Sequence, residues 1–381
     1  MLCVMTRLEF AARGICAVAL ALPLGLQGQE PRSLGKPDAE LKTPFTRIAT
    51  VRELKDGRLL VVDERERSLS LIDLRTGTAK QVGRAGAGPG EYAYPGRILA
   101  LPGDSSLLHD PGNARYLIIK PDGTPGETFR LPEPVFLSLG ARGSIPRATD
   151  ARGAIYFEGG PLTSGRGTAP TALDSVPLLR YERRSGNLDT VAWVQLAKRN
   201  VQVRPGQDGG VSISIGVQAF PARDDWSALP DGSVGVARVR DYHVDWYPST
   251  GKRTAGPPVR FTAIAVTEAE KEAFRSERRA RIAPRSSGSL PPDLPEPEWP
   301  AVMPPFVYWQ TFSRPNGELW VLRSHKSGEK PVYDVFSAPG TLTGRVALPT
   351  GTRLVGFGNG TAYLVRRDQD DLEYLQQYKL P

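Results

Sequence analysis

Short apolar runs separated by turn-forming dipeptides recur along most of this chain. In the clearest case Asp56-Gly57 precedes the apolar run 58–62 (RLLVV), and the alternating run 68–74 (SLSLIDL) follows after a polar interval. β-branched and alternating residues of this kind predict strands, and glycine after aspartate predicts a tight turn because glycine adopts positive φ without strain. The pattern therefore predicts a unit made of a turn, a strand, a polar loop and a second strand.

Six imperfect copies of this unit follow one another. The glycines that open them are separated by 46, 50, 79, 85 and 43 residues, and the two long intervals contain insertions. The other three intervals match one blade of a β-propeller, about 40–50 residues. A single unit cannot bury its own apolar face, so we predict an all-β, six-bladed β-propeller. The alternative, a β-sandwich with an extra domain, leaves the repeated order unexplained. The opening glycines are Gly57, Gly103, Gly153, Gly232, Gly317 and Gly360.

The sixth copy ends at Lys379 without an outer strand. An uncovered sheet edge invites pairing with another chain, so it has to be covered. The segment 34–45 precedes the first copy and is free to pair. We therefore predict that this segment supplies the outer strand of the last blade and closes the ring without a covalent link.

Two insertions interrupt the repeats. The longer, about 258–305, lies between the fourth and fifth blades and contains a short surface helix at 267–282, where Thr267 and Glu270 form a capping box. The Pro-rich stretch 284–305 follows and is predicted to be an extended strap across one end of the propeller. The shorter insertion, 198–219, contains the run SISIGV and is predicted to form an additional hairpin.

The glycine-rich stretch 82–92 (VGRAGAGPGEY) resembles the signature of exported bacterial six-bladed propellers related to NHL-repeat proteins. The segment 110–115 (DPGNAR) resembles the interstrand loop of the same family, and Asp63 its companion aspartate. The resemblance implies the propeller fold and export, but no single activity. Because the stretch lacks the Gly-Lys-Ser/Thr ending of a phosphate-binding loop, we interpret it as a crossover between blades.

The N-terminus has the order of a secretory signal. Arg7 and Arg13 precede an apolar run at 15–24, and small residues such as Gly28 lead from this run into a polar stretch. The run is too short to cross a bilayer, which needs about 20 residues. We predict a signal peptide at 1–28, a propeller domain at 29–381, no transmembrane segment in the mature chain, and a periplasmic, cell-surface or extracellular location. Both cysteines, Cys3 and Cys16, precede the predicted cleavage point.

The chain carries 49 Lys and Arg against 41 Asp and Glu, a formal net charge of +8. Because the excess is spread along the chain, it favours a solvated basic surface over nucleic-acid binding. We therefore expect a monomer whose partner is a protein, a glycan or an anionic small molecule.

One surface stands out as a candidate for ligand binding. The second strand of each predicted blade is expected to end six residues after the opening glycine, or seven residues after it in the second copy. The residues at these positions would lie at the mouth of the ring. Arginines at three consecutive blades would suit a carboxylate, sulfate or phosphate group. The alternative is that Arg366 pairs with Asp63 across the closure and the other arginines are solvated. The candidate residues are Asp63, His109, Asp110, Arg238, Arg323 and Arg366.

The sequence offers few other groups that could bind a metal or catalyse a reaction. His109, His243 and His325 have no metal-ligand spacing, and no Ser–His–Asp set can be assembled. We therefore predict no catalytic residue, metal or cofactor, and interpret the tryptophans Trp226, Trp246, Trp309 and Trp320 as blade packing. The leading interpretation is an exported, non-catalytic binding or scaffold propeller. The alternative is a calcium-dependent propeller hydrolase or lactonase.

Overall fold

A computed structural model describes residues 30–133, 135, 145–160, 173–198, 201–205, 211–282 and 295–380, with the backbone alone at 201–205, 211–215 and 281–282. The predicted signal peptide lies outside the described residues, and the predicted Pro-rich strap is described only from residue 295. Within the described ranges, no helix is long and apolar enough to span a membrane.

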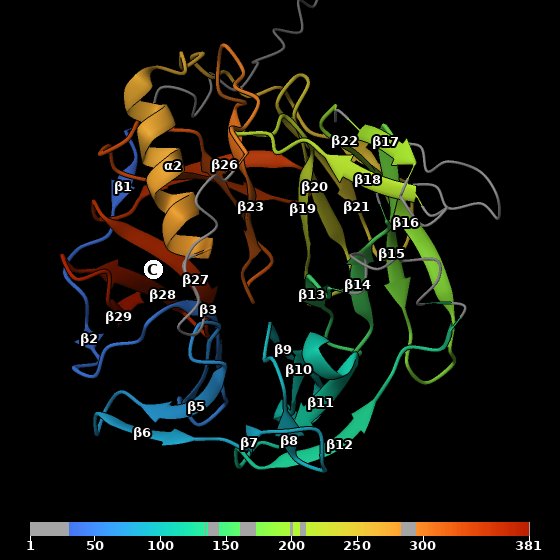
Figure 1. Ribbon diagram of the computed structural model, residues 1–381, viewed down its shortest axis with the longest axis vertical. Helices are drawn as coiled ribbons and strands as arrows, with labels where there is room; N and C mark the ends of the chain where they lie inside the picture. Colours follow the sequence, from blue (N-terminus) through green and yellow to red (C-terminus); the bar gives the residue numbers. More distant parts are fainter. Residues whose placement is uncertain are drawn as a thin grey trace, which may run out of the picture.

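The predicted six-bladed β-propeller is confirmed. Six sheets surround a common axis, and the innermost strand of each lies nearest that axis (Figure 1). The two strands of each predicted unit are the second and third strands of one blade. Gly57, which opens the first unit, has φ +85° in the turn before its strand. The first three blades contain β3 (Ile48–Glu53), β4 (Leu59–Asp63), β5 (Ser68–Asp73) and β6 (Thr78–Gln81); β9 (Ile98–Ala100), β10 (Ser106–Asp110), β11 (Arg115–Ile119) and β12 (Pro125–Phe129); and β13 (Ala148–Thr149), β14 (Ile155–Glu158), β15 (Ser175–Tyr181) and β16 (Leu188–Gln195).

The remaining three blades repeat this antiparallel order, from the inner strand outwards. Short 3₁₀ turns at Pro102–Asp104 and Pro111–Asn113 flank β10 in the second blade. The last three blades contain β19 (Asp225–Ala228), β20 (Val234–Arg238), β21 (His243–Tyr247) and β22 (Thr254–Ala255); β23 (Phe306–Ser313), β24 (Leu319–Arg323), β25 (Val332–Ser337) and β26 (Thr341–Ala347); and β27 (Thr352–Phe357), β28 (Thr361–Arg367) and β29 (Glu373–Lys379).

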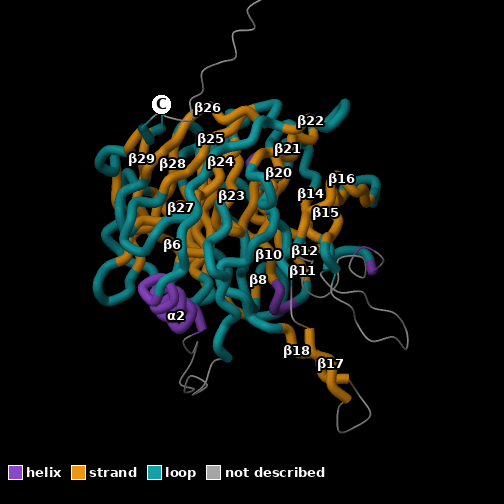
Figure 2. The backbone as a smooth tube through the Cα atoms, turned by 90° about the horizontal axis from the view of Figure 1, so that it is seen from above, coloured by secondary structure: helices purple, strands orange, loops and turns teal. Residues whose placement is uncertain are grey.

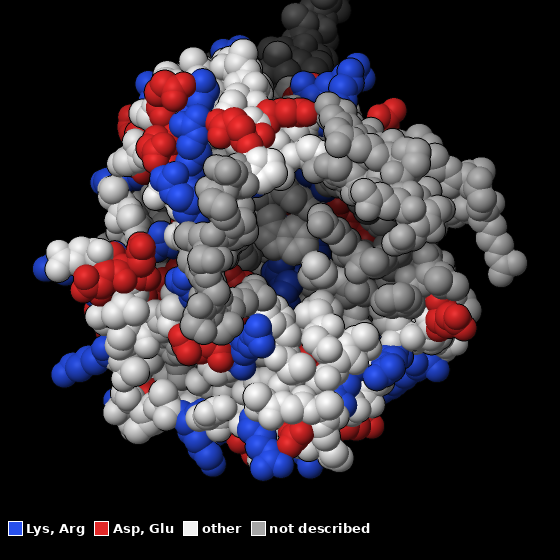
Figure 3. Space-filling model, in the orientation of Figure 1, with Lys and Arg blue, Asp and Glu red and all other residues white. Residues whose placement is uncertain are grey.

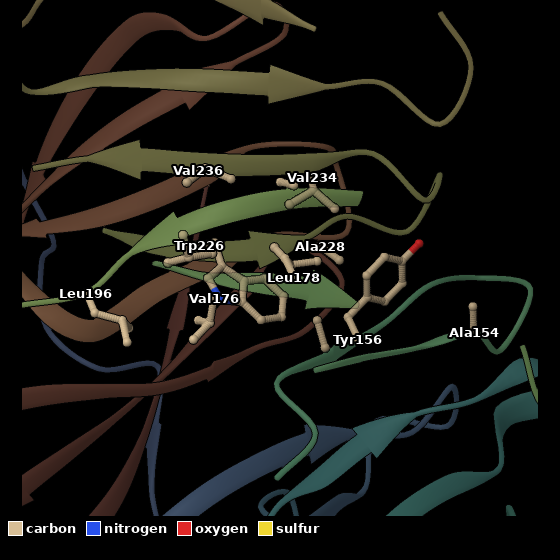
Figure 4. Packing of buried hydrophobic residues seen from close by; sticks show 12 residues of the cluster. Ala154, Tyr156, Val176, Leu178, Leu196, Trp226, Ala228, Val234 and Val236 are labelled. Atoms are coloured by element: carbon tan, nitrogen blue, oxygen red, sulfur yellow. The ribbon is translucent and has the colours of Figure 1, made fainter. Parts of the chain in front are cut away.

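The hydrophobic core lies between the blades. Buried apolar residues form six clusters, and each cluster joins residues of two adjacent blades. Between the third and fourth blades, Tyr156 and Leu178 face Trp226 and Val236, all fully buried (Figure 4). Trp246 and Trp320 are buried in the same way in other clusters, as predicted. Each blade is therefore stabilised by its neighbours.

The predicted closure is also confirmed. The strand β2 (Ala39–Glu40) pairs antiparallel with β29 and completes the sixth blade. A second contact was not predicted: β1 (Arg32–Ser33) pairs parallel with β26 and adds a fifth strand to the fifth blade. Between the first and sixth blades, Leu41 is buried at 1% exposure, and its N–H donates to the carbonyl of Leu375 at 2.9 Å.

The inserted elements lie on one face of the ring (Figure 2). The helix α2 (Glu268–Ile282) follows the capping contacts of Thr267 with Glu270, as predicted. The predicted hairpin is formed by β17 (Val201–Pro205) and β18 (Val211–Ile215). The glycine-rich stretch is a crossover between the first two blades, where β7 (Arg84–Ala85) pairs parallel with β8 (Glu91–Tyr92). Both long insertions join an outer strand to the next inner strand, so inner strands begin on this face.

Replacing Leu41 with alanine should weaken the closure of the ring. Loss of a buried leucine side chain is expected to lower the free energy of unfolding by about 2–5 kcal/mol. Denaturant unfolding measures the difference. The neighbouring Lys42 is exposed, so Lys42→Ala is the matched control and should leave the midpoint unchanged. Equal midpoints for the two variants would contradict the proposed contribution of this segment.

Candidate functional site

Arginines gather where the inner strands begin. Arg47, Arg97 and Arg147 each stand directly before the first residue of β3, β9 and β13, and Arg223 stands two residues before β19. Figure 3 shows this face hollowed near its centre, with basic side chains visible deep in the hollow. The sequence interpretation missed this set. The feature of the sequence that could have revealed three of these arginines is the equal spacing of 50 residues between Arg47, Arg97 and Arg147.

Three of these arginines are neutralised by carboxylates, and Arg47 pairs with Glu64 at 3.0 Å and Glu277 at 2.9 Å. The guanidinium of Arg147 lies 2.7 Å from Asp225 and 3.6 Å from Glu158. Arg223 also pairs with Glu158, which accepts a further hydrogen bond of 3.1 Å from the indole N–H of Trp226. Because Arg147, Arg223 and Asp225 are all buried, these pairs are screened little by water.

Aromatic side chains complete the cluster. Arg147 lies between two indoles, 4.7 Å from the ring centroid of Trp226 and 4.3 Å from that of Trp309. The ring of Tyr308 lies 4.1 Å from the guanidinium of Arg223. These distances are those of cation–π contacts. Trp309 therefore does not serve blade packing as predicted: it is half-buried and stacks on an arginine of another blade.

A strand irregularity brings Trp309 into this position. The pairing of β23 with β24 shifts register between Phe306 and Thr311, and Trp309 has a φ of +69°. A bulky residue rarely adopts positive φ, and a bulge re-aims the side chains of the strand that carries it. The backbone here is strained in a way that residues at functional sites often are.

Arg97 lacks the counter-ion that its neighbours have. Among the described residues no carboxylate oxygen lies within 4.0 Å of its guanidinium, and its buried Nε has no hydrogen-bond partner. Its guanidinium carbon lies 5.3 Å from the ring centroid of Trp309. Burial, reinforced by the like charge of Arg147, lowers the pKa of Arg97 to about 10 despite the attraction of Asp225. The site therefore holds a half-buried positive charge that is not locally neutralised.

The aspartates that were predicted as ligand candidates are buried and accept backbone hydrogen bonds. Asp63 accepts N–H groups of Thr46 and Arg47 at 2.8 and 3.2 Å, and of Arg65 and Glu66 at 2.9 and 3.0 Å. It therefore joins the loop after β4 to the segment that enters β3.

Asp110 has the same arrangement in the second blade. It accepts the N–H groups of Ala93 and Tyr94 at 3.1 and 2.9 Å and the side-chain amide of Asn113 at 2.7 Å. Arg115 of the same loop donates to the carbonyls of Gly88 and other residues of the crossover. The two segments that carry the family resemblance thus hold each other in place.

The three predicted arginines lie at or next to strand ends, as expected, but each pairs with a carboxylate. The alternative pair between Arg366 and Asp63 is not formed. The ligand-binding role of these arginines stays a prediction, and the structure does not bring them together at one point. The pairs are Arg238 with Asp224 (2.7 Å) and Asp245 (2.6 Å), Arg323 with Asp334 (2.7 Å), and Arg366 with Glu40 (2.9 Å).

His109 is buried in the second blade, with its ring centroid 5.3 Å from that of Tyr116. Burial and, to a lesser degree, the charge of Arg97 lower its pKa to about 4, although Asp110 favours the protonated form. The ring is therefore neutral at physiological pH. Across the described ranges, no three His, Cys, Asp or Glu side chains cluster so as to hold a metal ion.

Replacing Asp63 with alanine should destabilise the first blade. Four backbone N–H groups lose their acceptor, so the free energy of unfolding is expected to fall by about 2 kcal/mol or more. Chemical denaturation gives the value. Glu66→Ala removes an exposed carboxylate three residues away and serves as the control. An Asp63→Ala variant as stable as this control would show that the hydrogen bonds contribute nothing.

His109 should make stability depend on pH. The folded protein keeps this ring neutral down to about pH 4, whereas the unfolded chain protonates it near pH 6.5. The contribution of the neutral His109 ring to the free energy of unfolding is therefore complete above about pH 6.5. It decreases as the pH falls towards 4, and at about pH 5 the loss is about 2 kcal/mol. Unfolding of the wild type and His109→Gln at about pH 7.5 and 5 measures this. A stability difference between the two proteins that does not change with pH would contradict the assignment.

No protein-family model matches this chain, and no curated protein sequence matches it. Several solved structures do match this chain. A candidate exported protein from Bacteroides fragilis is 13% identical with a TM-score of 0.49, over 92% of this chain and 94% of that one. A gluconolactonase from Xanthomonas campestris is 12% identical with a TM-score of 0.43, over 93% and 96%. Regucalcin from Agrobacterium tumefaciens is 11% identical with a TM-score of 0.38, over 93% and 97%. At these values the similarity does not bear on the activity of the present chain.

Proposed function

We propose that this protein is an exported, non-catalytic binding propeller that takes a small anionic ligand at the mouth of its central channel. The observation that carries the proposal is Arg97, a half-buried guanidinium whose buried Nε has no hydrogen-bond partner and which has no neighbouring carboxylate among the described residues. Three arginines, Arg97, Arg147 and Arg223, meet there with two carboxylates, Glu158 and Asp225, so the cluster has one positive charge in excess.

An anion beside Arg97 would supply the missing counter-charge. A guanidinium presents a planar set of donors that suits a carboxylate, sulfate or phosphate group. Arg97 and Arg147 both contact Trp309, so the two cations are held on one side chain and need little rearrangement to receive a ligand. Pre-organised groups of this kind raise affinity because less motion is lost on binding.

The arginines named from the sequence belong to the same proposal in a secondary role. Arg238, Arg323 and Arg366 lie at the ends of strands that finish on the same face, although each is paired. They would raise the electrostatic potential around the mouth and attract an anion from solution. Export remains part of the proposal and is supported by the charged, apolar and small-residue order of residues 7–28.

The alternative, a calcium-dependent hydrolase, requires carboxylates that converge on a cation. The carboxylates at the mouth, Glu158 and Asp225, already contact arginines, and a cation there would also meet the charge of Arg97. The electrostatics of the mouth therefore favour an anion. Calcium titration followed by thermal melting separates the two hypotheses.

The test replaces Arg97 with glutamine. Wild-type protein is expected to bind phosphate, sulfate or citrate at constant ionic strength, with a rise in melting temperature and measurable heat of binding. Arg97→Gln should weaken this binding by about tenfold or more, since it removes the unpaired charge. Arg75→Gln removes the same charge from an exposed position in the first blade and should bind like the wild type.

Two outcomes would contradict the proposal. One is equal binding of all three anions by the wild type and Arg97→Gln. The other is a large melting shift at micromolar calcium without any response to anions, which would favour the hydrolase.

A further inference from the structure

A second concave site lies away from the channel, between the third and fourth blades. It is a groove of about 850 Å³, within the range of about 300–1,000 Å³ usual for ligand sites. One wall is the outer strand of the third blade, β16, and the other is the edge formed by β20 and β21. All of its lining residues belong to the described chain. The residues that matter below are Ser175, Thr190, Trp193, Gln195, Asp245 and Tyr247.

Trp193 dominates one wall of the groove. Its exposed fraction is 57%, the highest of the large hydrophobic residues in the described chain. The strand that carries it pairs with β15 along its whole length, so the indole is presented from a rigid element. An exposed indole on a rigid strand is a platform for the apolar face of a ring, and large aromatic surfaces contribute most of the energy of many binding sites.

Most charges in the groove are paired with one another, and the two others, the exposed Asp174 and Arg240, are opposite in sign. Arg238 bridges Asp224 and Asp245, Arg253 lies 3.3 Å from Asp245, and His243 lies 3.0 Å from Asp241. A charged ligand would have to displace one of these partners. The groove therefore favours a neutral ligand, in contrast to the channel mouth.

Both walls offer hydrogen-bonding groups: Tyr247 on β21, and Ser175, Thr190 and Gln195 on the side that carries Trp193. The hydroxyl of Tyr247 accepts from Arg238 at 2.7 Å, which leaves its own proton free to donate. The hydroxyls of Ser175 and Thr190 and the amide of Gln195 can each donate and accept. Such a mixture suits a ligand with many hydroxyl groups.

We propose that this groove binds a neutral oligosaccharide, with one sugar ring stacked on Trp193. A pyranose has an apolar C–H face and a rim of hydroxyl groups, so it matches an exposed indole beside alternating donors and acceptors. A volume of about 850 Å³ leaves room for more than one sugar ring. Arg238 borders this groove and also has a secondary role in the anion proposal, but sugar binding here does not depend on the anion site at Arg97.

The test uses neutral hexasaccharides: maltohexaose, cellohexaose, xylohexaose and chitohexaose, each titrated calorimetrically into the mature protein. At least one should bind to the wild type. Trp193→Ala should weaken that binding by about tenfold or more. Because the side chain is exposed, this variant should melt like the wild type. Phe261→Ala removes another exposed aromatic side chain, 41% exposed and outside the groove, and should bind normally.

The same titration distinguishes this site from the channel. Arg97→Gln should retain full sugar binding. The proposal is overturned if none of the four sugars binds to the wild type, if Trp193→Ala binds as tightly as the wild type, or if Arg97→Gln abolishes binding. It is also overturned if Trp193 proves necessary only for a polyanion such as heparin.

Discussion

The whole molecule depends on one constraint: a four-stranded blade has two apolar faces and can bury neither by itself. Each of the six hydrophobic clusters is shared by two adjacent blades, as with Trp226 of the fourth blade packed against Tyr156 of the third. Removing one blade would expose two such faces. The ring is therefore stable only when closed, and the short strand β2 with the buried Leu41 completes the last interface.

Closure also creates the candidate site, because it brings the starts of all six inner strands to one mouth. Arg97, Arg147 and Trp309 come from three different blades, yet both guanidinium groups contact the ring of Trp309. The bulge in β23 contributes at the same place, since a regular strand would not present Trp309 to both arginines. The lateral groove has a different origin: it lies where the rims of two neighbouring blades separate, above their shared core.

The features predicted correctly from the sequence were those that local chemistry or the repeated unit determines. Glycine at positive φ marks the turns, as Gly57 does, and the pair Thr267 and Glu270 marks the start of the helix. The partners of side chains at strand ends could not be predicted in this way. Arg238 and Asp245 lie on two paired strands, and the register of the pairing decides whether they meet. It places Asp245 opposite Val236, and Arg238 follows two residues later, within reach of Asp245. The channel arginines Arg97, Arg147 and Arg223 meet across intervals of 50 and 76 residues, which no local pattern describes.

The N-terminal segment holds two blades at once, because β1 pairs with the fifth blade and β2 with the sixth. These are the last two blades to be synthesised, whereas the segment that clasps them emerges from the ribosome among the first. Domains commonly fold from the N-terminus during synthesis, but this one cannot finish until β29 exists. The early segment must therefore wait without its partners until the last blade has been synthesised.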